Sequence, residues 1–434
     1  MKARIKMSIK TNTYVILIVA ALIVACSGAR AQAVAPALAL VKKEQPALLQ
    51  TMKTLVEIES GSRDIEGLDR IANDIAGRLK ALGGNVELIE PEQVDQRGKL
   101  GKMVRATFTG TGTRKILLLA HMDTVYPRGM LAKQPFKIEG DRAWGLGIAD
   151  NKHGIAVILH TLAILKASNF RDYGTVTVLI NGDEEIGSRA SRSEITRLGA
   201  AHDAVLSFEG GGSPQVDEIT LATSGLARAT LNVRGRAAHA GVAPEQGVNA
   251  LYEMAHQVLQ ASDLSDPAIG LKVNWTLANA GIVANMIPPG AQASATVRVE
   301  RIADFDGVEQ KLRELIRNKR LPEAEVTLEF VRNRPPLQPN GASRALAAHA
   351  QYIYGEIGLK LAAPERSSGI GTDAAYAALK TQAPVIEGLG LRGFGAHSTD
   401  AEYVLISSIE PRLYLATRII MDIANGKVPL AGKR

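Results

Sequence analysis

Cysteine is nearly absent from this chain of 434 residues, because Cys26 is the only one. Internal disulfides are therefore excluded, and so are thiolate metal ligands and cysteine nucleophiles in the mature part of the chain. If the protein is exported, its hydrophobic core and bound metal must hold it together without crosslinks.

Long apolar runs are also lacking. The run Tyr14–Ala25 spans about 12 residues, which is short of the roughly 20 that a membrane-spanning helix needs. Basic residues precede it and small residues around Ala29–Ala31 follow it, so we predict a secretory signal peptide over residues 1–31 and a periplasmic or secreted protein. Ile23-Val24-Ala25-Cys26 also fits a lipoprotein cleavage box, so a lipid anchor at Cys26 is an alternative.

Little net charge remains once this segment is removed. Residues 1–31 hold five basic residues and no acidic ones, so the formal charge falls from +7 to +2. The high isoelectric point therefore gives no reason to expect a nucleic-acid partner.

The length exceeds what one hydrophobic core usually organises. From about residue 45, helical and strand-like stretches alternate, which predicts an α/β domain with a mainly parallel sheet. The strands expected are 115–120, 176–180 and 204–208, and the helices expected are 46–59, 67–82 and 154–167.

The pattern changes after Gly210–Pro214, where alternating stretches and two helices between 228 and 330 predict an inserted α+β, ferredoxin-like module. Helical patterns return at 343–357 and 411–425. We therefore expect a signal peptide (1–31), a first part of a catalytic domain (32–217), the inserted domain (218–332) and a second part of the catalytic domain (333–434).

Polar residues follow the predicted strands. His121 and Asp123 end the run Leu117–Ala120, and Asp150 precedes the helix 154–167. Taken singly, His121 and Asp123 could form a strand-end hydrogen bond, and Asp150 could be a helix N-cap. Alternatively, Asp123 orients His121 as a metal ligand.

Three adjacent carboxylates, Asp183 to Glu185, follow the strand 176–180. Like charges so close together form either a solvated loop or a cation site, where one glutamate binds metal and the other moves protons. Glu209 follows the strand 204–208, and His397 lies in a loop of small residues. Nitrogen and oxygen donors without sulfur favour zinc, or less often cobalt or manganese.

The order His121-x-Asp123, Asp150, Glu184-Glu185, Glu209 and His397 resembles the di-zinc peptidase family that contains aminoacylases, desuccinylases and carboxypeptidases. The resemblance covers residues 45–425 and is greatest to its folate-cleaving glutamate carboxypeptidases. It extends to Asp123-Thr124-Val125-Tyr126, to Gly371–Tyr376 and to Ala401-Glu402-Tyr403.

The resemblance implies two Zn²⁺ ions per subunit, with Co²⁺ or Mn²⁺ as alternatives. Asp150 would bridge the ions, His121 and Glu209 would complete one site, and Glu185 and His397 the other. Glu184 would be the general base and Asp123 would orient His121.

The inserted domain would be a lid and dimerisation domain. The implied roles are a partner-site contact for His239, and substrate carboxylate binding for Asn285, Arg298 and Arg334. The chain departs from the family pattern at His153, Ser368 and Ile370, which stand where relatives carry glycine. A side chain there would be strained if φ were positive.

The expected function is zinc-dependent hydrolysis of an amide bond that releases a C-terminal amino acid, with glutamate favoured, from folate-like, N-acyl or peptide substrates. Within the family, a dipeptidase, an N-acyl amino acid deacylase or a desuccinylase is the alternative. A non-catalytic, metal-dependent periplasmic solute receptor is the alternative from another class. Glu184 argues against it, because a receptor would need the metal ligands but no general base.

Overall fold

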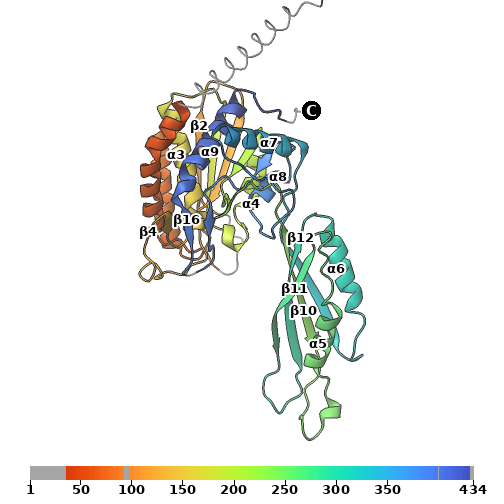
Figure 1. The fold of residues 1–434 in the computed structure, drawn as a ribbon. Coiled ribbons are helices and arrows are strands. Elements are labelled where there is room, and N and C mark those ends of the chain that lie inside the picture. Colours follow the sequence, from red (N-terminus) through yellow and green to blue (C-terminus); the bar gives the residue numbers. More distant parts are fainter. Residues whose placement is uncertain (1–35, 92–97, 399, 431–434) are drawn as a thin grey trace, which may run out of the picture.

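The computed structural model describes residues 36–91, 98–398 and 400–430. These form two domains, and Figure 1 shows the smaller one extending away from the larger. The predicted signal peptide and Cys26 lie outside the described residues. Within the part of the chain that is described, no helix combines the length and the apolar character needed to cross a membrane.

A six-stranded sheet forms the centre of the larger domain. Its strand order is β1 (Asn85–Ile89), β2 (Met103–Thr109), β6 (Thr175–Asn181), β3 (Lys115–His121), β7 (Ala204–Ser207) and β14 (Val385–Ile386). Strands β6, β3, β7 and β14 run parallel, whereas β2 is antiparallel to both β1 and β6. The prediction of an α/β fold with mainly parallel strands is therefore confirmed.

Helices cover both faces of this sheet because its strands are apolar on both sides. In β3, Ile116 and Leu118 join the larger core, whereas Leu117 and Leu119 join a second core on the opposite face. The first core includes the helix over residues 36–56, α2 (Ile65–Leu82), α3 (His153–Ala167), α7 (Gly341–Glu356) and α9 (Ile409–Ala424). The second lies under α4 (Arg192–Ala201) and α8 (Ala374–Ala378).

Short elements surround one end of the domain. A small sheet has the order β15 (Gly393–Phe394), β16 (Tyr403–Leu405), β5 (Arg142–Trp144) and β4 (Lys137–Glu139), and β8 (Gly212–Ser213) pairs with β9 (Val216–Asp217). Single helical turns of this domain cover Ile148–Lys152, Glu184–Ile186 and Ile406–Ser408, and a further turn, Pro244–Gln246, belongs to the smaller domain.

The smaller domain, called the lid below, is an antiparallel sheet with two helices on one face. Its elements follow in the order β10 (Gly225–Arg234), α5 (Ala250–Gln260), β11 (Lys272–Ala280), β12 (Gly290–Val299), α6 (Asp304–Leu315) and β13 (Glu325–Arg334). The strand order β11-β12-β10-β13 is that of the predicted ferredoxin-like module. Alternate residues of β10, such as Ala227 and Ala229, are buried beneath the helices.

Candidate metal centre

The candidate ligands lie at one edge of the larger sheet. His121 is the last residue of β3, Glu185 follows β6, and Glu209 follows β7. Asp150 lies in the turn before α3, and His397 lies in the loop between β15 and β16. Open α/β sheets bind ligands at the carboxyl ends of their strands, and the structure gathers these five residues at that edge.

Two groups of side chains share Asp150. In the first group, His121 Nε2 lies 2.9 Å from Asp150 Oδ1 and 3.3 Å from Glu209 Oε1. In the second, His397 Nε2 lies 3.2 Å from Asp150 Oδ2 and 3.1 Å from Glu185 Oε2. Each oxygen of the Asp150 carboxylate therefore faces one histidine, which is the arrangement that a bridging ligand requires.

The donor set fits divalent cations on the chemistry of its own atoms. Glu185 Oε1 is buried and has no hydrogen-bond partner among the described residues, and an unpaired buried oxygen of this kind is expected where a metal binds. Glu209 and Glu185 are packed beside Asp150, so a cation would relieve their mutual repulsion. The main chain of His397 has φ 64°, a left-handed conformation that histidine tolerates better than most residues.

The pKa shifts describe the same crowding of negative charge. Burial would lower the pKa of His121, but the charge of Glu209 and hydrogen bonds to Asp123 and Asp150 raise it well above its ordinary value. Hydrogen bonds to Asp150 and Glu185 raise the pKa of His397 to about 10. Burial raises the pKa of Glu185 to about 7. The site therefore attracts positive charge strongly.

Asp123 connects the two halves of the site. Its Oδ1 atom lies 3.3 Å from His121 Nδ1 and accepts the backbone N–H of Glu184 at 3.0 Å, and its Oδ2 atom accepts the N–H of Glu185 at 3.1 Å. The hydroxyl of Ser62 donates to Oδ2 at 2.8 Å. His121 Nδ1 also lies 3.1 Å from the Asp123 carbonyl oxygen. The side chain and the backbone of Asp123 therefore both face His121, and its carboxylate also holds the backbone of both glutamates.

Glu402 holds the loop that carries Asp150. This buried carboxylate accepts the backbone N–H groups of Gly147 at 2.9 Å and Ala149 at 2.8 Å, and the hydroxyl of Tyr126 at 2.6 Å. Burial raises the pKa of Glu402 to about 7. Sequence reasoning noted Glu402 and Tyr126 only as part of the family resemblance and gave neither a role. The motifs Asp123–Tyr126 and Ala401–Tyr403, which contain these two residues, were the only sequence features that could have indicated a role for them.

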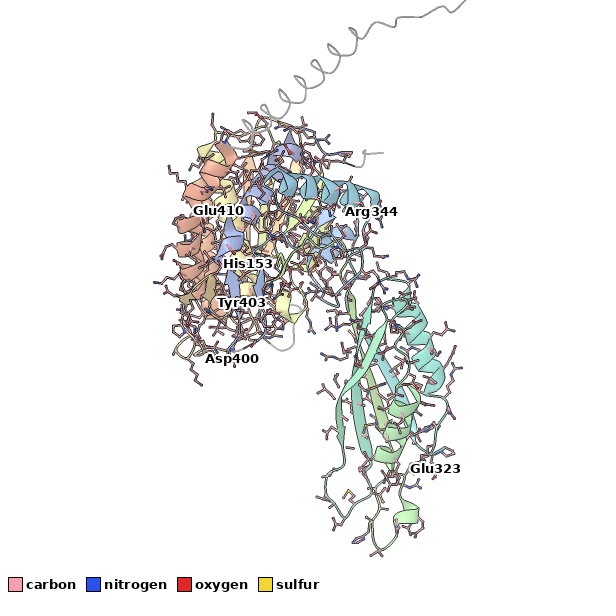
Figure 2. The ribbon with its side chains drawn as sticks, in the orientation of Figure 1. His153, Glu323, Arg344, Asp400, Tyr403 and Glu410 are labelled. Atoms are coloured by element: carbon pink, nitrogen blue, oxygen red, sulfur yellow. The ribbon has the colours of Figure 1, made fainter. Side chains whose placement is uncertain are left out.

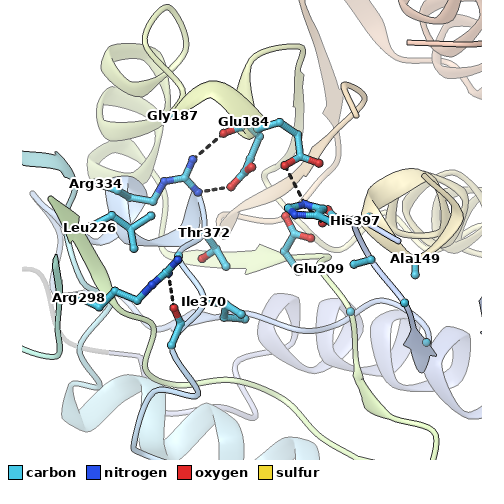
Figure 3. A pocket seen from close by; sticks show the side chains of 18 of the residues that line it. Ala149, Glu184, Gly187, Glu209, Leu226, Arg298, Arg334, Ile370, Thr372 and His397 are labelled. Carbon is cyan, nitrogen blue, oxygen red and sulfur yellow. Dashed lines mark hydrogen bonds and ion pairs between the residues drawn. The ribbon is translucent and has the colours of Figure 1, made fainter. Parts of the chain in front are cut away.

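Glu184 points away from the ligand atoms toward Arg334, as Figure 3 shows. Arg334 Nη1 donates to Glu184 Oε1, and its Nη2 atom donates to the Glu184 carbonyl oxygen at 2.8 Å. Burial would lower the pKa of Arg334, but the charge of Glu184 raises it above its ordinary value. Arg334 was predicted to bind substrate carboxylate; in the structure its guanidinium is already paired with the predicted base.

A cleft of about 630 Å³ opens onto these residues and has walls from both domains. The larger domain contributes four of the five candidate ligands, Asp150, Glu185, Glu209 and His397, together with Phe394, which is 58% exposed. The lid contributes Leu226, Arg298 and Arg334. In Figure 3, the two arginines lie on one side of His397 and Ala149 lies on the other.

Four predicted site residues do not line this cleft: His121 and Asp123 are buried in the larger domain, and His239 and Asn285 lie in the lid. Arg236, three residues before His239, forms an ion pair at 3.4 Å with Glu323, which Figure 2 places toward the end of the lid remote from the larger domain. The backbone of Ala240, next to His239, donates to the Asn285 carbonyl at 2.9 Å. His239 and Asn285 therefore lie together, but far from the candidate ligands of their own chain.

The three departures from the family pattern cause no left-handed backbone. His153 has φ −63°, and neither Ser368 nor Ile370 is among the described non-glycine residues with positive φ. His153 is buried, accepts the Leu391 N–H at 3.1 Å and contacts the Ala149 carbonyl at 3.1 Å. The expected strain is absent, and only Ile370 of the three lines the cleft.

Two groups of histidine and carboxylate side chains lie at the edge of a parallel sheet, and an inserted lid domain forms the other wall of their cleft. This arrangement is that of a metallopeptidase. The family model described as Peptidase family M20/M25/M40 matches residues 117–422, and the chain belongs to this family.

Relatives of this chain share most of its length. Carboxypeptidase G2 of Pseudomonas sp. (strain RS-16) is 47% identical over 384 residues, which cover 88% of this chain and 91% of that protein. Succinyl-diaminopimelate desuccinylase of Xanthomonas oryzae pv. oryzae (strain PXO99A) is 27% identical over 369 residues, 80% of this chain and 93% of that protein. The structure of aminopeptidase PepT from Bacillus cereus ATCC 10987 has a similar fold, with a TM-score of 0.72, 22% identity and coverage of 88% and 99%.

Proposed function

We propose that this enzyme is a zinc-dependent carboxypeptidase that hydrolyses the amide bond before a C-terminal glutamate in folate-like, N-acyl or peptide substrates. The observation that carries the proposal is the pair of ligand groups sharing Asp150 in a cleft whose other wall holds two arginines. The similarity to Carboxypeptidase G2 over most of both chains supports it.

The metal roles follow from the geometry of the donors. His121, Asp150 and Glu209 would hold one zinc ion, and Asp150, Glu185 and His397 the other. When bound, the two ions polarise the scissile carbonyl and activate the attacking water. Cobalt or manganese would fit the same nitrogen and oxygen donors.

Glu184 is the proposed proton carrier because it is a neighbour of ligand Glu185 and lines the cleft. It takes a proton from the attacking water and returns it to the leaving nitrogen. Arg334 holds Glu184 through one hydrogen bond to its carboxylate and one to its backbone carbonyl oxygen. Asp123 fixes the backbone of Glu184 and faces the ring of His121.

The two walls of the cleft suggest where the released amino acid and the acyl part of the substrate bind. Arg298 lies in the lid wall, and the planar guanidinium of arginine suits a carboxylate of the released amino acid. The exposed ring of Phe394 lies in the wall of the larger domain and offers an apolar surface to the acyl part. The alternative is a dipeptidase, deacylase or desuccinylase. The similarity to a desuccinylase is the observation that supports this alternative.

The substrate assignment predicts the amino acid that is released. The zinc-loaded protein should release glutamate from pteroyl-glutamate and from N-acyl-glutamates with a kcat/KM at least 10-fold higher than that for alanine release from matched N-acyl compounds. Alanine has no side-chain carboxylate, so the enzyme group that binds this carboxylate would stay unpaired, at a cost of about 1.5–3 kcal/mol. Chromatography of the released amino acids measures this ratio. Cleavage of neutral dipeptides with folate analogues left intact would favour the alternative.

We further propose a homodimer in which His239 completes the partner's site. His239 Nδ1 accepts the N–H groups of Gly241 and Val242 at 3.1 Å each, so the proton lies on Nε2 and is available for donation to the developing oxyanion. Large apolar side chains of the lid are exposed, including Leu277 at 68% and Ile282 at 75%, which suits a buried contact between subunits.

This arrangement predicts complementation between two inactive variants. His239→Ala and Glu184→Gln should each be nearly inactive alone, whereas a co-refolded mixture should regain about a quarter of the wild-type activity, since half of randomly paired dimers are mixed and each has one intact site. A mixture that stays inactive, although sedimentation shows mixed dimers, would contradict a role for His239 across the interface.

The remaining parts of the assignment are also proposals. We propose that residues 1–31 direct export to the periplasm or the medium, with lipid attachment at Cys26 as the alternative. The division expected from the sequence was residues 32–217 and 333–434 for the catalytic domain and 218–332 for the lid. Ile219 and Leu221 belong to the core of the larger domain, and the lid strands lie between Gly225 and Arg334, so we propose that both lid boundaries lie a few residues later in the chain.

A further inference from the structure

Four residues form one row across the lid sheet at the end nearest the larger domain. Lys272 on β11 is opposite Arg298 on β12, Arg298 is opposite Leu226 on β10, and Leu226 is opposite Arg334 on β13. The residues next to these in sequence are buried beneath the lid helices: Val273 beside Lys272, Val297 beside Arg298 and Ala227 beside Leu226. Side chains alternate between the two faces of a strand, so Lys272, Arg298 and Leu226 face away from those helices.

The charges in this row are not equally compensated. Arg334 is paired with Glu184, and Asp373 lies 3.8 Å away from it. Within the described ranges, neither Arg298 nor Lys272 has a carboxylate partner. Arg298 Nη1 donates to the Gly369 carbonyl at 2.5 Å, and Lys272 Nζ lies 3.5 Å from the Ser368 carbonyl.

Two neighbouring cations therefore converge on one loop with only neutral oxygens beside them. Residues directly opposite in antiparallel strands lie about 5 Å apart, and like charges at that separation destabilise a sheet. A nearby acidic residue, Glu300, does not relieve this, because the structure pairs it with Arg366 at 3.4 Å. An anion bound beside Arg298 and Lys272 would relieve it.

The lysine ammonium lies beside a glycine of the cleft wall, although Lys272 is not itself one of the lining residues. Gly369 lines the cleft and has φ 115°, and a Cβ atom added there would lie 3.2 Å from Lys272 Nζ. Any other residue would be strained at this φ and would crowd the ammonium. Glycine at this position therefore leaves space between the cleft wall and the Lys272 ammonium.

We propose that Lys272 is a specificity-determining residue that binds the side-chain carboxylate of the released amino acid, while Arg298 binds its α-carboxylate. The assignment rests on the proposed glutamate-releasing function. The row begins at Arg334, which contacts Glu184, and continues through Leu226 and Arg298 to Lys272. Lys272 is therefore farther from Glu184 than Arg298 is. The α-carboxylate is attached next to the scissile nitrogen, so the side-chain carboxylate reaches the more distant cation.

The test compares two substrates that differ in one group. We expect Lys272→Met to lower kcat/KM for an N-acyl-glutamate about 10- to 100-fold, mainly through KM, and to leave the matched N-acyl-glutamine unchanged. Lys272→Arg should retain most of the preference for glutamate. Arg228→Met is the matched control, because Arg228 is an exposed cation on the same face of β10, two residues beyond Leu226, and should keep the wild-type ratio.

A binding measurement separates recognition from catalysis. In calorimetry with the zinc-loaded protein, Lys272→Met should weaken the binding of free L-glutamate and leave that of L-glutamine unchanged. A wild-type enzyme that prefers glutamate, combined with a Lys272→Met variant that keeps this preference, overturns the role of Lys272 alone. A wild-type enzyme with no preference between the two substrates overturns both this role and the proposed release of glutamate.

Discussion

Replacing Glu184 with glutamine should lower kcat about 1,000-fold or more and leave two metal ions bound. Glutamine has the shape of glutamate but cannot accept the proton from the attacking water. Glu184 is absent from both ligand groups, so metal content should not fall. Steady-state kinetics and elemental analysis of the same preparation measure the two quantities.

A matched control is Glu194→Gln. Glu194 also has arginine partners, since Arg105 lies 2.5 Å and Arg197 2.6 Å from its Oε1 atom, but it lies on α4 outside the cleft. This variant should keep kcat close to that of the wild type. A Glu184→Gln enzyme with a normal turnover would remove Glu184 from the chemistry and require another proton acceptor.

Replacing Asp150 with alanine should abolish both metal binding and activity, because each of its oxygens faces a different ligand group. In the wild-type protein, a metal at 1,000 times its dissociation constant should stabilise the fold by about 4 kcal/mol, and chelation should remove this. The melting temperature of Asp150→Ala should not respond to metal or to chelator. Differential scanning calorimetry with and without zinc measures the response.

His397→Ala provides the comparison for Asp150. His397 belongs to only one of the two groups, so this variant should retain one equivalent of metal where Asp150→Ala retains none. Two tightly bound equivalents in Asp150→Ala would show that the carboxylate does not bridge the sites.

Much of the fold follows from hydrophobic patterning. The runs ending at Ala120, Ile180 and Phe208 are apolar on both faces, which is typical of buried parallel strands, and all three are strands in the structure. The antiparallel strands β1 and β2 were not predicted. In β1 the pattern of exposure is irregular because it lies at the sheet edge, so its sequence carries no clear period of two.

The site was predictable only in part. The end of a parallel strand explains why His121, Glu185 and Glu209 meet, since neighbouring strands place their last residues at one edge. The pairing of Arg334 with Glu184 depends on how the lid meets the larger domain, and no local pattern near either residue encodes it. The contact of Ser62 with Asp123 likewise joins residues 61 positions apart.

The lid is joined to the larger domain at the start of β10 and at the end of β13, and these two strands are neighbours. Both crossings of the chain therefore lie side by side. Arg298 and Lys272 belong to the lid and the ligand groups around Asp150 to the larger domain, so the distance between these cations and the ligand groups depends on the angle at which the two crossings hold the lid.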